Sequence, residues 1–271
     1  MFYWWTLRQL RSGDSYRQQQ AVARLCKWFS ARRAVPPLAA FLEPLGDSWA
    51  QKMAIEALGR FGGQQAIQAL RKAMTRTESY LSEYAARAAV RAGWQPETQV
   101  DHAVYSVAAG EYEAAVSVGP EAVPFLCASL NSPRPRGPVI GALRRIGDPR
   151  AVPALVGVVD RHHGLDREAA VGALGDLGGP DLVGKMLGWT AEEDIAEDVA
   201  AALLKLLGRH AGAIAATHLD TLANLPDLGG LTWELTSVGE WTYEEQRIQQ
   251  VDCSQIRASA ANEKERRLRR P

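Results

Sequence analysis

The sequence has few cysteines, and their spacing excludes two classes of small protein. The three are Cys26, Cys127 and Cys253, which successively lie 101 and 126 residues apart. No CxxC pair occurs, so neither a disulfide framework nor a zinc knuckle is predicted. We expect reduced thiols in a reducing compartment. Cys26 has Lys27 beside it but stands among apolar positions, which favours a buried thiol over a reactive one.

Long apolar runs are also lacking. The longest uninterrupted one, Ala151–Val159, has nine residues, whereas a helix needs about 20 to span a bilayer. The apolar start Met1–Trp5 is followed at once by Arg8 and Arg11, which does not fit a signal peptide. We therefore expect no contact with the membrane, a cytoplasmic location, and an N-terminal helix that packs on the first repeat.

The chain has no excess of either charge, with 31 Lys and Arg against 31 Asp and Glu. This balance counts against a dedicated nucleic-acid or membrane-surface binder. The 46% hydrophobic and 23% charged residues exclude a disordered chain and suit a sizeable core. The neutral sum conceals a gradient, because residues 1–100 carry 14 basic and 7 acidic residues and residues 101–200 carry 8 and 15. A salt-sensitive contact between the basic part of one copy and the acidic part of another therefore stays open.

Internal repetition is what the sequence does have. Six glycines recur at steps of 31, 26, 28, 31 and 30 residues: Gly62, Gly93, Gly119, Gly147, Gly178 and Gly208. Small or apolar residues stand four and seven positions before most of them, as Leu58 and Ile55 do before Gly62. Phe29 takes the glycine position in a first copy, which makes seven copies in all.

Each copy predicts two helices joined by a tight turn. Apolar residues at spacings of three and four form one helical stripe, and the glycine after them suits a left-handed C-cap. In several copies proline is expected in the first turn of the second helix, at Pro36, Pro124 and Pro153, and Asp148 is a suitable cap. A single pair cannot bury its stripe alone, so stacking into an all-α solenoid is predicted.

The string Ala142–Leu155, ALRRIGDPRAVPAL, resembles the HEAT-like repeat of the phycobilisome-lyase type. The resemblance covers roughly residues 15–224 and implies an α-solenoid of about seven repeats. We expect an apolar N-terminal cap over residues 1–14, the solenoid over 15–224, and a C-terminal cap with a basic tail over 225–271. Such repeats occur in proteins of unrelated function, so the resemblance indicates a fold rather than an activity.

Irregular segments interrupt the pattern. In the shortened copy we expect helices over 100–108 and 112–118, and a stiff loop at Arg134 between two prolines. Residues 244–270 are predicted to be mostly helical, from the spacing of Ile248, Val251 and Ile256, with a solvated basic end.

Catalytic and metal-binding motifs are scarce. The pair His162–His163 is the only metal-like cluster, and it falls in a predicted turn, where a solvated loop is the simpler interpretation. No GxSxG or phosphate-binding loop occurs. The acidic run 192–198 is interpreted as a helix N-terminus in which Thr190 and Glu193 form a capping box. We therefore predict no catalytic, metal or cofactor residues.

The leading functional hypothesis is a non-catalytic scaffold or adaptor that binds another protein through the solenoid surface. One column of the repeat is basic in the early copies and supplies Lys27, Arg60, Arg91 and Arg145. Trp4 and Trp5, at the open end of the solenoid, are further contact candidates, whereas Trp28 is expected in the core.

Two alternatives remain. The resemblance would also suit a chaperone-like lyase that attaches a bilin to a phycobiliprotein cysteine. By analogy with HEAT-like DNA glycosylases, the basic N-terminal part would suit nucleic acid, although the acidic second half counts against it.

Overall fold

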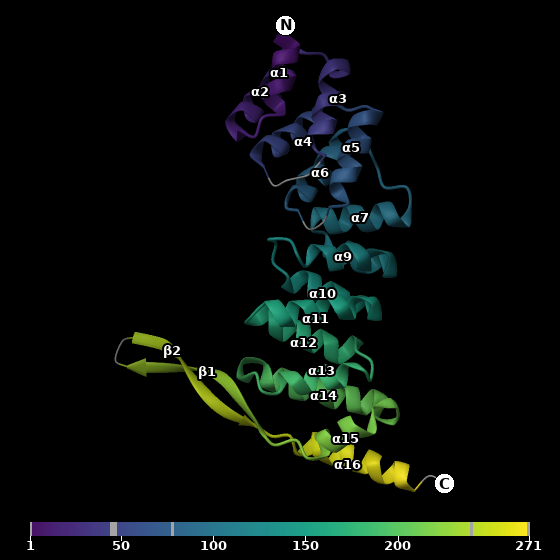
Figure 1. The fold of residues 1–271 in the computed structure, drawn as a ribbon, viewed down its shortest axis with the longest axis vertical. Coiled ribbons are helices and arrows are strands. Elements are labelled where there is room, and N and C mark those ends of the chain that lie inside the picture. Colours follow the sequence, from purple (N-terminus) through teal and green to yellow (C-terminus); the bar gives the residue numbers. More distant parts are fainter. Residues whose placement is uncertain (1, 44–47, 77–78, 239–240, 270–271) are drawn as a thin grey trace. The chain divides into compact units, whose positions relative to one another are not determined.

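The computed structural model describes residues 2–43, 48–76, 79–238 and 241–269, and within 230–249 it describes the backbone alone. Figure 1 shows these parts as a succession of helices followed by a β-hairpin and a last helix. The α-helices are α1 (Phe2–Leu10), α2 (Ser15–Trp28), α3 (Ala31–Phe41), α4 (Trp49–Phe61), α5 (Gln64–Met74), α6 (Leu81–Arg91), α7 (Gln99–Ala109), α8 (Tyr112–Val118), α9 (Val123–Ser129), α10 (Gly137–Ile146), α11 (Val152–Arg161), α12 (Leu165–Leu177), α13 (Leu182–Trp189), α14 (Ala196–His210), α15 (Ala216–Ala223) and α16 (Ser254–Leu268). Short 3₁₀ turns are η1 (Pro120–Ala122), η2 (Pro149–Ala151), η3 (Glu193–Ile195) and η4 (Ala211–Ala213).

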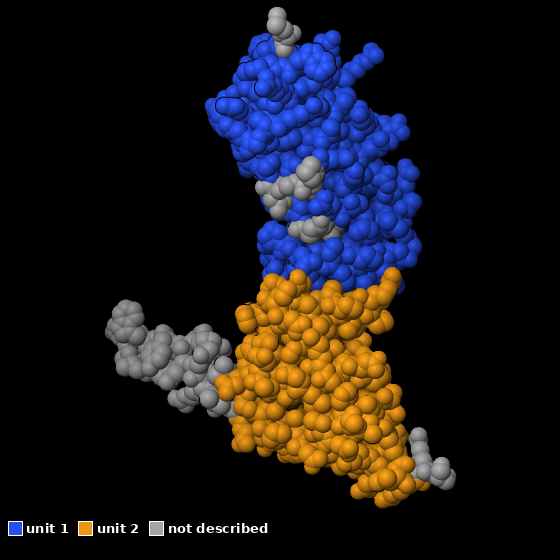
Figure 2. Space-filling model, in the orientation of Figure 1, with its two compact units in different colours: residues 1–142 blue, residues 143–271 orange. Residues whose placement is uncertain are grey.

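Seven helix pairs, from α2–α3 to α14–α15, correspond one by one to the seven copies in the sequence. The predicted all-α solenoid of HEAT-like repeats is confirmed. The chain divides into two compact units, Met1–Ala142 (unit 1) and Leu143–Pro271 (unit 2), coloured separately in Figure 2.

Within unit 1, first helices pack on first helices and second helices on second helices. Thus α2 contacts α4 and α4 contacts α6, while α3 contacts α5 and α5 contacts α7. The apolar stripe of each helix is buried, as Leu25, Ile55 and Leu58 are. In unit 2, α12 packs on the next first helix, α14, in the same manner, and also on α11, the second helix of the preceding pair, with Leu174 and Leu203 buried.

The glycine column is confirmed as a series of positive-φ turns in four of six copies, although Gly62 and Gly119, with ψ of −162° and −140°, do not adopt the left-handed helical conformation. Gly62, Gly93, Gly119 and Gly147 have φ of 65°, 94°, 85° and 79°. The prediction is wrong for Gly208, because α14 continues past it to His210. It is also wrong for Gly178, which closes α12 with extended backbone at φ −69°.

A second glycine, three residues before the turn glycine, sets how closely neighbouring pairs approach. A Cβ built on Gly175 would lie 2.8 Å from the Cβ of Ala202 in α14 and 2.9 Å from its Cα. In unit 1, a Cβ on Gly59 would lie 2.9 Å from the Cβ of Ala88 in α6. Such distances are shorter than van der Waals contact, so neither position has room for a side chain.

The proline prediction holds for two positions and fails for one. Pro124 and Pro153 lie in the first turns of α9 and α11, and Asp148 accepts a hydrogen bond from the Arg150 N–H as a cap. Pro36 instead lies inside α3, because the carbonyl of Ser30 already accepts the N–H groups of Arg33 and Ala34 and the helix begins a turn earlier.

A column of polar side chains joins consecutive pairs. Each stands in the first turn of a first helix or directly before it, four residues before the apolar stripe, and donates to a main-chain carbonyl at the end of the preceding helix. Gln51 Nε2 donates to the Phe41 carbonyl at 3.1 Å, Arg136 Nε to Leu130 at 2.8 Å and Arg167 Nε to Val159 at 3.0 Å. Carbonyls at helix ends lack intrahelical partners, so these bonds satisfy them.

The shortened copy matches its prediction, with α7 and α8 where they were expected. The loop between the two prolines has a defined role inside unit 1. Its Arg134 donates from Nη1 to the Ala108 carbonyl at 2.9 Å and from Nη2 to Ser82 Oγ at 2.9 Å. Arg134 therefore caps the end of α7 and ties it to α6.

The C-terminal region corrects the prediction. Strands β1 (Leu228–Val238) and β2 (Trp241–Val251) form an antiparallel pair in which Leu228 faces Val251, so the expected helix over 244–251 is wrong. The helical prediction holds from Ser254 onward, where α16 packs on α14 and α15. Its end is not simply solvated, because Arg267 Nη2 donates to the carbonyls of Ala211 and Ile214 at 2.6 and 2.8 Å.

The predicted capping box at Thr190 is also wrong. Thr190 is the C-cap residue of α13 and donates its hydroxyl to the Leu187 carbonyl at 2.7 Å. The turn η3 then separates it from α14, so Glu193 does not occupy the third position of a helix that starts at Thr190.

Candidate partner-binding surfaces

Three of the predicted contact residues come together in unit 1. Lys27, Arg60 and Arg91 lie in the last turns of α2, α4 and α6, which contact one another in order, and all three are exposed. We call these residues the basic row. Cations at helix C-termini are favoured by the helix dipole, which explains their place but leaves their charges facing solvent.

The charges of the basic row are not neutralised locally. None of the three forms an ion pair with another residue that the structure describes. Burial raises the pKa of the Cys26 thiol, and the guanidinium of Arg60 beside it opposes this rise. This pair confirms that the ends of α2 and α4 lie next to each other, and it agrees with an unreactive Cys26.

Arg145 belongs to unit 2 and is not part of the row. It is exposed in the last turn of α10, and the equivalent position in α12 is Asp176, which bridges the neighbouring helices. Lys205 Nζ contacts Asp176 Oδ1 at 2.7 Å, and Arg144 Nε contacts Oδ2. Burial alone would raise the pKa of Asp176, but these two cations lower it below its usual value. In unit 2 this column therefore contributes to stacking.

The N-terminal helix carries exposed aromatic residues. Trp4 is 74% exposed and Trp5 46%, whereas Leu10 on the opposite face is buried in the core. Arg8, Arg11 and Arg17 lie beside them around a hollow of about 640 Å³. The head surface is defined as Phe2, Trp4, Trp5, Arg8, Arg11 and Arg17.

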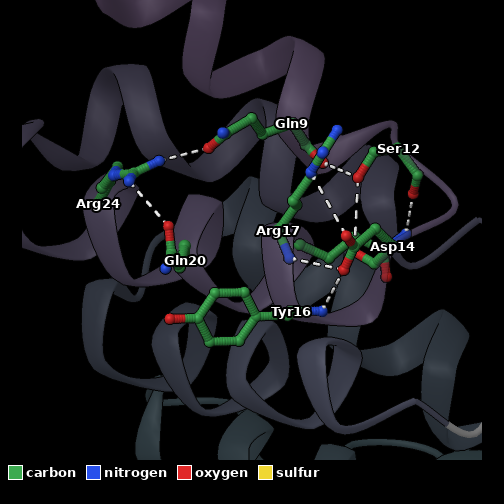
Figure 3. Close-up of polar contacts among 8 residues, drawn as sticks. Gln9, Ser12, Asp14, Tyr16, Arg17, Gln20 and Arg24 are labelled. Carbon is green, nitrogen blue, oxygen red and sulfur yellow. Dashed lines mark hydrogen bonds and ion pairs between the residues drawn. The ribbon is translucent and has the colours of Figure 1, made fainter.

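Polar contacts between α1 and α2 hold the head surface in place (Figure 3). Asp14 caps α2 by accepting the N–H groups of Tyr16 and Arg17 at 2.9 and 3.2 Å. Arg24 contacts Gln9 and lies 4.5 Å from the ring of Trp5, a cation–π distance. Trp5 is thereby fixed by α2, and Trp4 extends into solvent.

Trp28 contradicts its expected place in the core. It is 63% exposed, with Lys27 Nζ 5.2 Å from its ring. The buried stripe of α2 runs through Val22 and Leu25. Trp28 continues its spacing but is the last residue of the helix and lies outside the buried part.

The acidic surface of unit 2 was recognised from the sequence only as the run 192–198, without the part that α12 supplies. The start of α12, the turn η3 and the first turn of α14 form the acidic corner, defined as Leu165, Glu168, Glu193, Glu197 and Asp198. Arg167 fixes this arrangement, because its Nη1 lies 2.8 Å from both carboxylate oxygens of Asp194. Leu165 is 81% exposed beside these carboxylates.

Crowding of carboxylates in the acidic corner has a measurable consequence at Asp198. Burial, then Glu168 and Glu197, raise the pKa of this residue above its usual value. Ionised Asp198 therefore lowers the free energy of unfolding. This loss of stability is present at neutral pH and absent below the ordinary aspartate pKa.

We expect Asp198→Asn to raise the free energy of unfolding in urea at pH 7 but not at pH 3. The control Asp160→Asn removes a carboxylate that is paired with Lys185 and should not raise the free energy of unfolding. If Asp198→Asn lowers the free energy of unfolding at pH 7, the carboxylate of Asp198 is not destabilising.

The described residues contain no group of three or more His, Cys, Asp or Glu side chains placed to hold a metal ion. In the same part of the chain, no helix combines the length and apolar character needed to cross a bilayer.

Comparison with known families agrees with the repeat architecture. The family model for HEAT repeats matches residues 5–91, and the model for the PBS lyase HEAT-like repeat matches residues 139–161. No curated protein matches the chain. The two family matches fall on α1–α6 and on α10–α11. The chain is therefore a HEAT-like repeat protein, with a repeat of the phycobilisome-lyase type among its seven helix pairs.

Proposed function

We propose that the protein is a non-catalytic adaptor that binds an acidic segment of another protein through the basic row. The observation that carries the proposal is the alignment of Lys27, Arg60 and Arg91 on three consecutive helix ends, without ion-pair partners among the described residues. Stacked first helices repeat the same charge at a regular interval, so an extended acidic chain can meet several of them at once.

Charge reversal of two row residues tests this function. We expect Arg60→Glu together with Arg91→Glu to weaken partner binding by about tenfold or more, since like charges would then face each other. The free energy of unfolding should change by less than about 1 kcal/mol, because both side chains are exposed. Tagged protein would be used to purify partners from its source cells, with partners identified by mass spectrometry and affinities measured for each variant.

Lys72→Glu with Arg87→Glu provides the matched control. Both residues are exposed in unit 1, carry ion pairs to Glu43 and Glu83, and lie outside the row. The control changes the net charge by the same amount and should retain the partner. Equal retention by both double variants would contradict binding through the basic row.

The match of residues 139–161 to the PBS lyase HEAT-like repeat supports a second candidate, a bilin lyase. A bilin mixed with the pure protein would then show a shifted visible absorbance band, and an unchanged spectrum would remove this candidate. If duplex DNA is retained by the protein on a filter at low salt, and released as salt rises, the basic row serves nucleic acid instead.

A further inference from the structure

The head surface combines two properties that a surface facing only water seldom has. Three large aromatic side chains, Phe2, Trp4 and Trp5, are between 46% and 74% exposed on one short helix. Arginines border the hollow of about 640 Å³ that lies against the two tryptophans. Aromatic residues and arginine are the types most enriched at the centres of protein interfaces.

The charge around this hollow selects an acidic occupant. Residues 1–42 contain seven Lys and Arg against a single acidic residue, Asp14. Asp14 is engaged by the amides of α2 and by Arg17 Nε at 3.4 Å, so it leaves Arg8 and Arg11 uncompensated. An occupant must therefore present carboxylates around an apolar side chain.

The acidic corner has that composition. Leu165, the most exposed aliphatic side chain of α12, stands at the first position of the helix, and Glu168 follows one turn later. Glu193 and Glu197 are exposed on the adjoining turn and helix, and no described residue forms an ion pair with either. A projecting leucine one turn before a glutamate, on a helix that contacts the acidic turn η3 and α14, is complementary to a hollow lined by tryptophan and arginine.

We infer that the head surface of one copy of the chain binds the acidic corner of a second copy. Leu165 of the second copy enters the hollow beside Trp4 and Trp5, and Arg8 and Arg11 face its glutamates. Because the two surfaces differ, the contact is heterologous, and it can either close between copies or extend from one copy to the next. Its charged rim makes association dependent on salt.

Two complementary variants test this contact. We expect the unmodified protein to show a mass above the monomer in sedimentation velocity at about 50 mM salt, and association weakened about tenfold or more at about 500 mM. Arg8→Glu with Arg11→Glu, and separately Glu193→Arg with Glu197→Arg, should each be monomeric alone. Mixed together, they should associate again, because the intact corner of the first variant meets the intact head of the second, and the reversed charges of the two variants are also opposite in sign.

Further variants address the apolar part and the specificity. Leu165→Ser should weaken association without any change in charge. Lys72→Glu with Arg87→Glu should associate as the unmodified protein does. Two results would overturn the inference. One is an unmodified protein that stays monomeric at about 200 µM in low salt. The other is a mixture of the two charge-reversed variants in which both stay monomeric. Arg8→Glu with Arg11→Glu leaves the basic row intact, so failure here is distinguishable from failure of the proposed partner binding.

Discussion

Replacing Arg167 by methionine is expected to lower the free energy of unfolding by about 2–4 kcal/mol. The Arg167 side chain is only 7% exposed, and it contacts Asp194, Glu192 and the Val159 carbonyl at once. Removing one partner of a buried ion pair costs about 3–5 kcal/mol, because the remaining charge is left without compensation. We expect a loss that begins below that range because the Asp194 side chain is 36% exposed and water can solvate it after the change.

Urea denaturation followed by circular dichroism measures this loss, and two variants make it specific. Arg167→Lys keeps the charge but loses the planar fork, so an intermediate loss is expected. Arg269→Met removes an 81% exposed arginine paired with Glu265 and should cost less than about 0.5 kcal/mol. If Arg167→Met costs no more than Arg269→Met, the buried contacts of Arg167 do not hold α12 to the turn before α14.

Gly175→Ala should destabilise the protein by about 1–2 kcal/mol although alanine is the better helix former. Alanine in place of glycine gains about 1 kcal/mol within a helix. The added Cβ, however, would meet the Cβ and Cα of Ala202 at 2.8 and 2.9 Å, so α12 and α14 must separate. Overpacking of this kind costs about 1–3 kcal/mol, and backbone atoms at the contact place it at the upper end.

Gly172 in the same helix provides the matched control. A Cβ on Gly172 meets nothing within 4 Å, so Gly172→Ala should stabilise by about 0.5–1 kcal/mol. The two substitutions are chemically identical and lie one turn apart, so opposite signs isolate the close approach. Stabilisation by both would show that α12 and α14 have more room than the structure gives them.

The repeat architecture could be predicted because each copy encodes it locally. The spacing of Ile55, Leu58 and Gly62 defines a stripe and its end, and the same spacing returns in every pair. The predictions were wrong where a contact with another segment determines where a helix begins or ends. At Gly208 the helix continues to His210, and Arg209, directly after the glycine, donates to the main chain of α12, a contact that the repeat pattern does not contain. At Pro36 an earlier cap at Ser30 fixed the helix start.

The hairpin was missed because a helical spacing was followed too far. Ile248, Val251 and Ile256 fit one helix face, but Leu231, Trp233 and Leu235 alternate, and β-branched and aromatic residues are frequent from Thr232 to Tyr243. The pairing of Leu228 with Val251 depends on both segments together, so the pattern within either segment alone does not predict it.

The candidate surfaces were predictable only in part. Lys27, Arg60 and Arg91 share a repeat position, so stacking alone brings them together. The acidic corner draws residues from α12, η3 and α14, and its geometry depends on the contact of Arg167 with Asp194. The acidic run 192–198 was the available signal, but the contribution of α12 follows only from the packing of the helices.

The polar column that begins with Gln51 makes the stability of one helix pair depend on the pair before it. When a first helix detaches, the carbonyl at the end of the previous pair loses its donor, so the fraying of one pair loosens the next. The α14 copy has Glu197, an acceptor, at this position, and there α12 and α14 are joined instead by Asp176 with Lys205. Amide hydrogen exchange should consequently be shared across the boundaries closed by Gln51, Arg136 and Arg167. The polar column thus couples the opening of each pair that it joins to the opening of the pair before it.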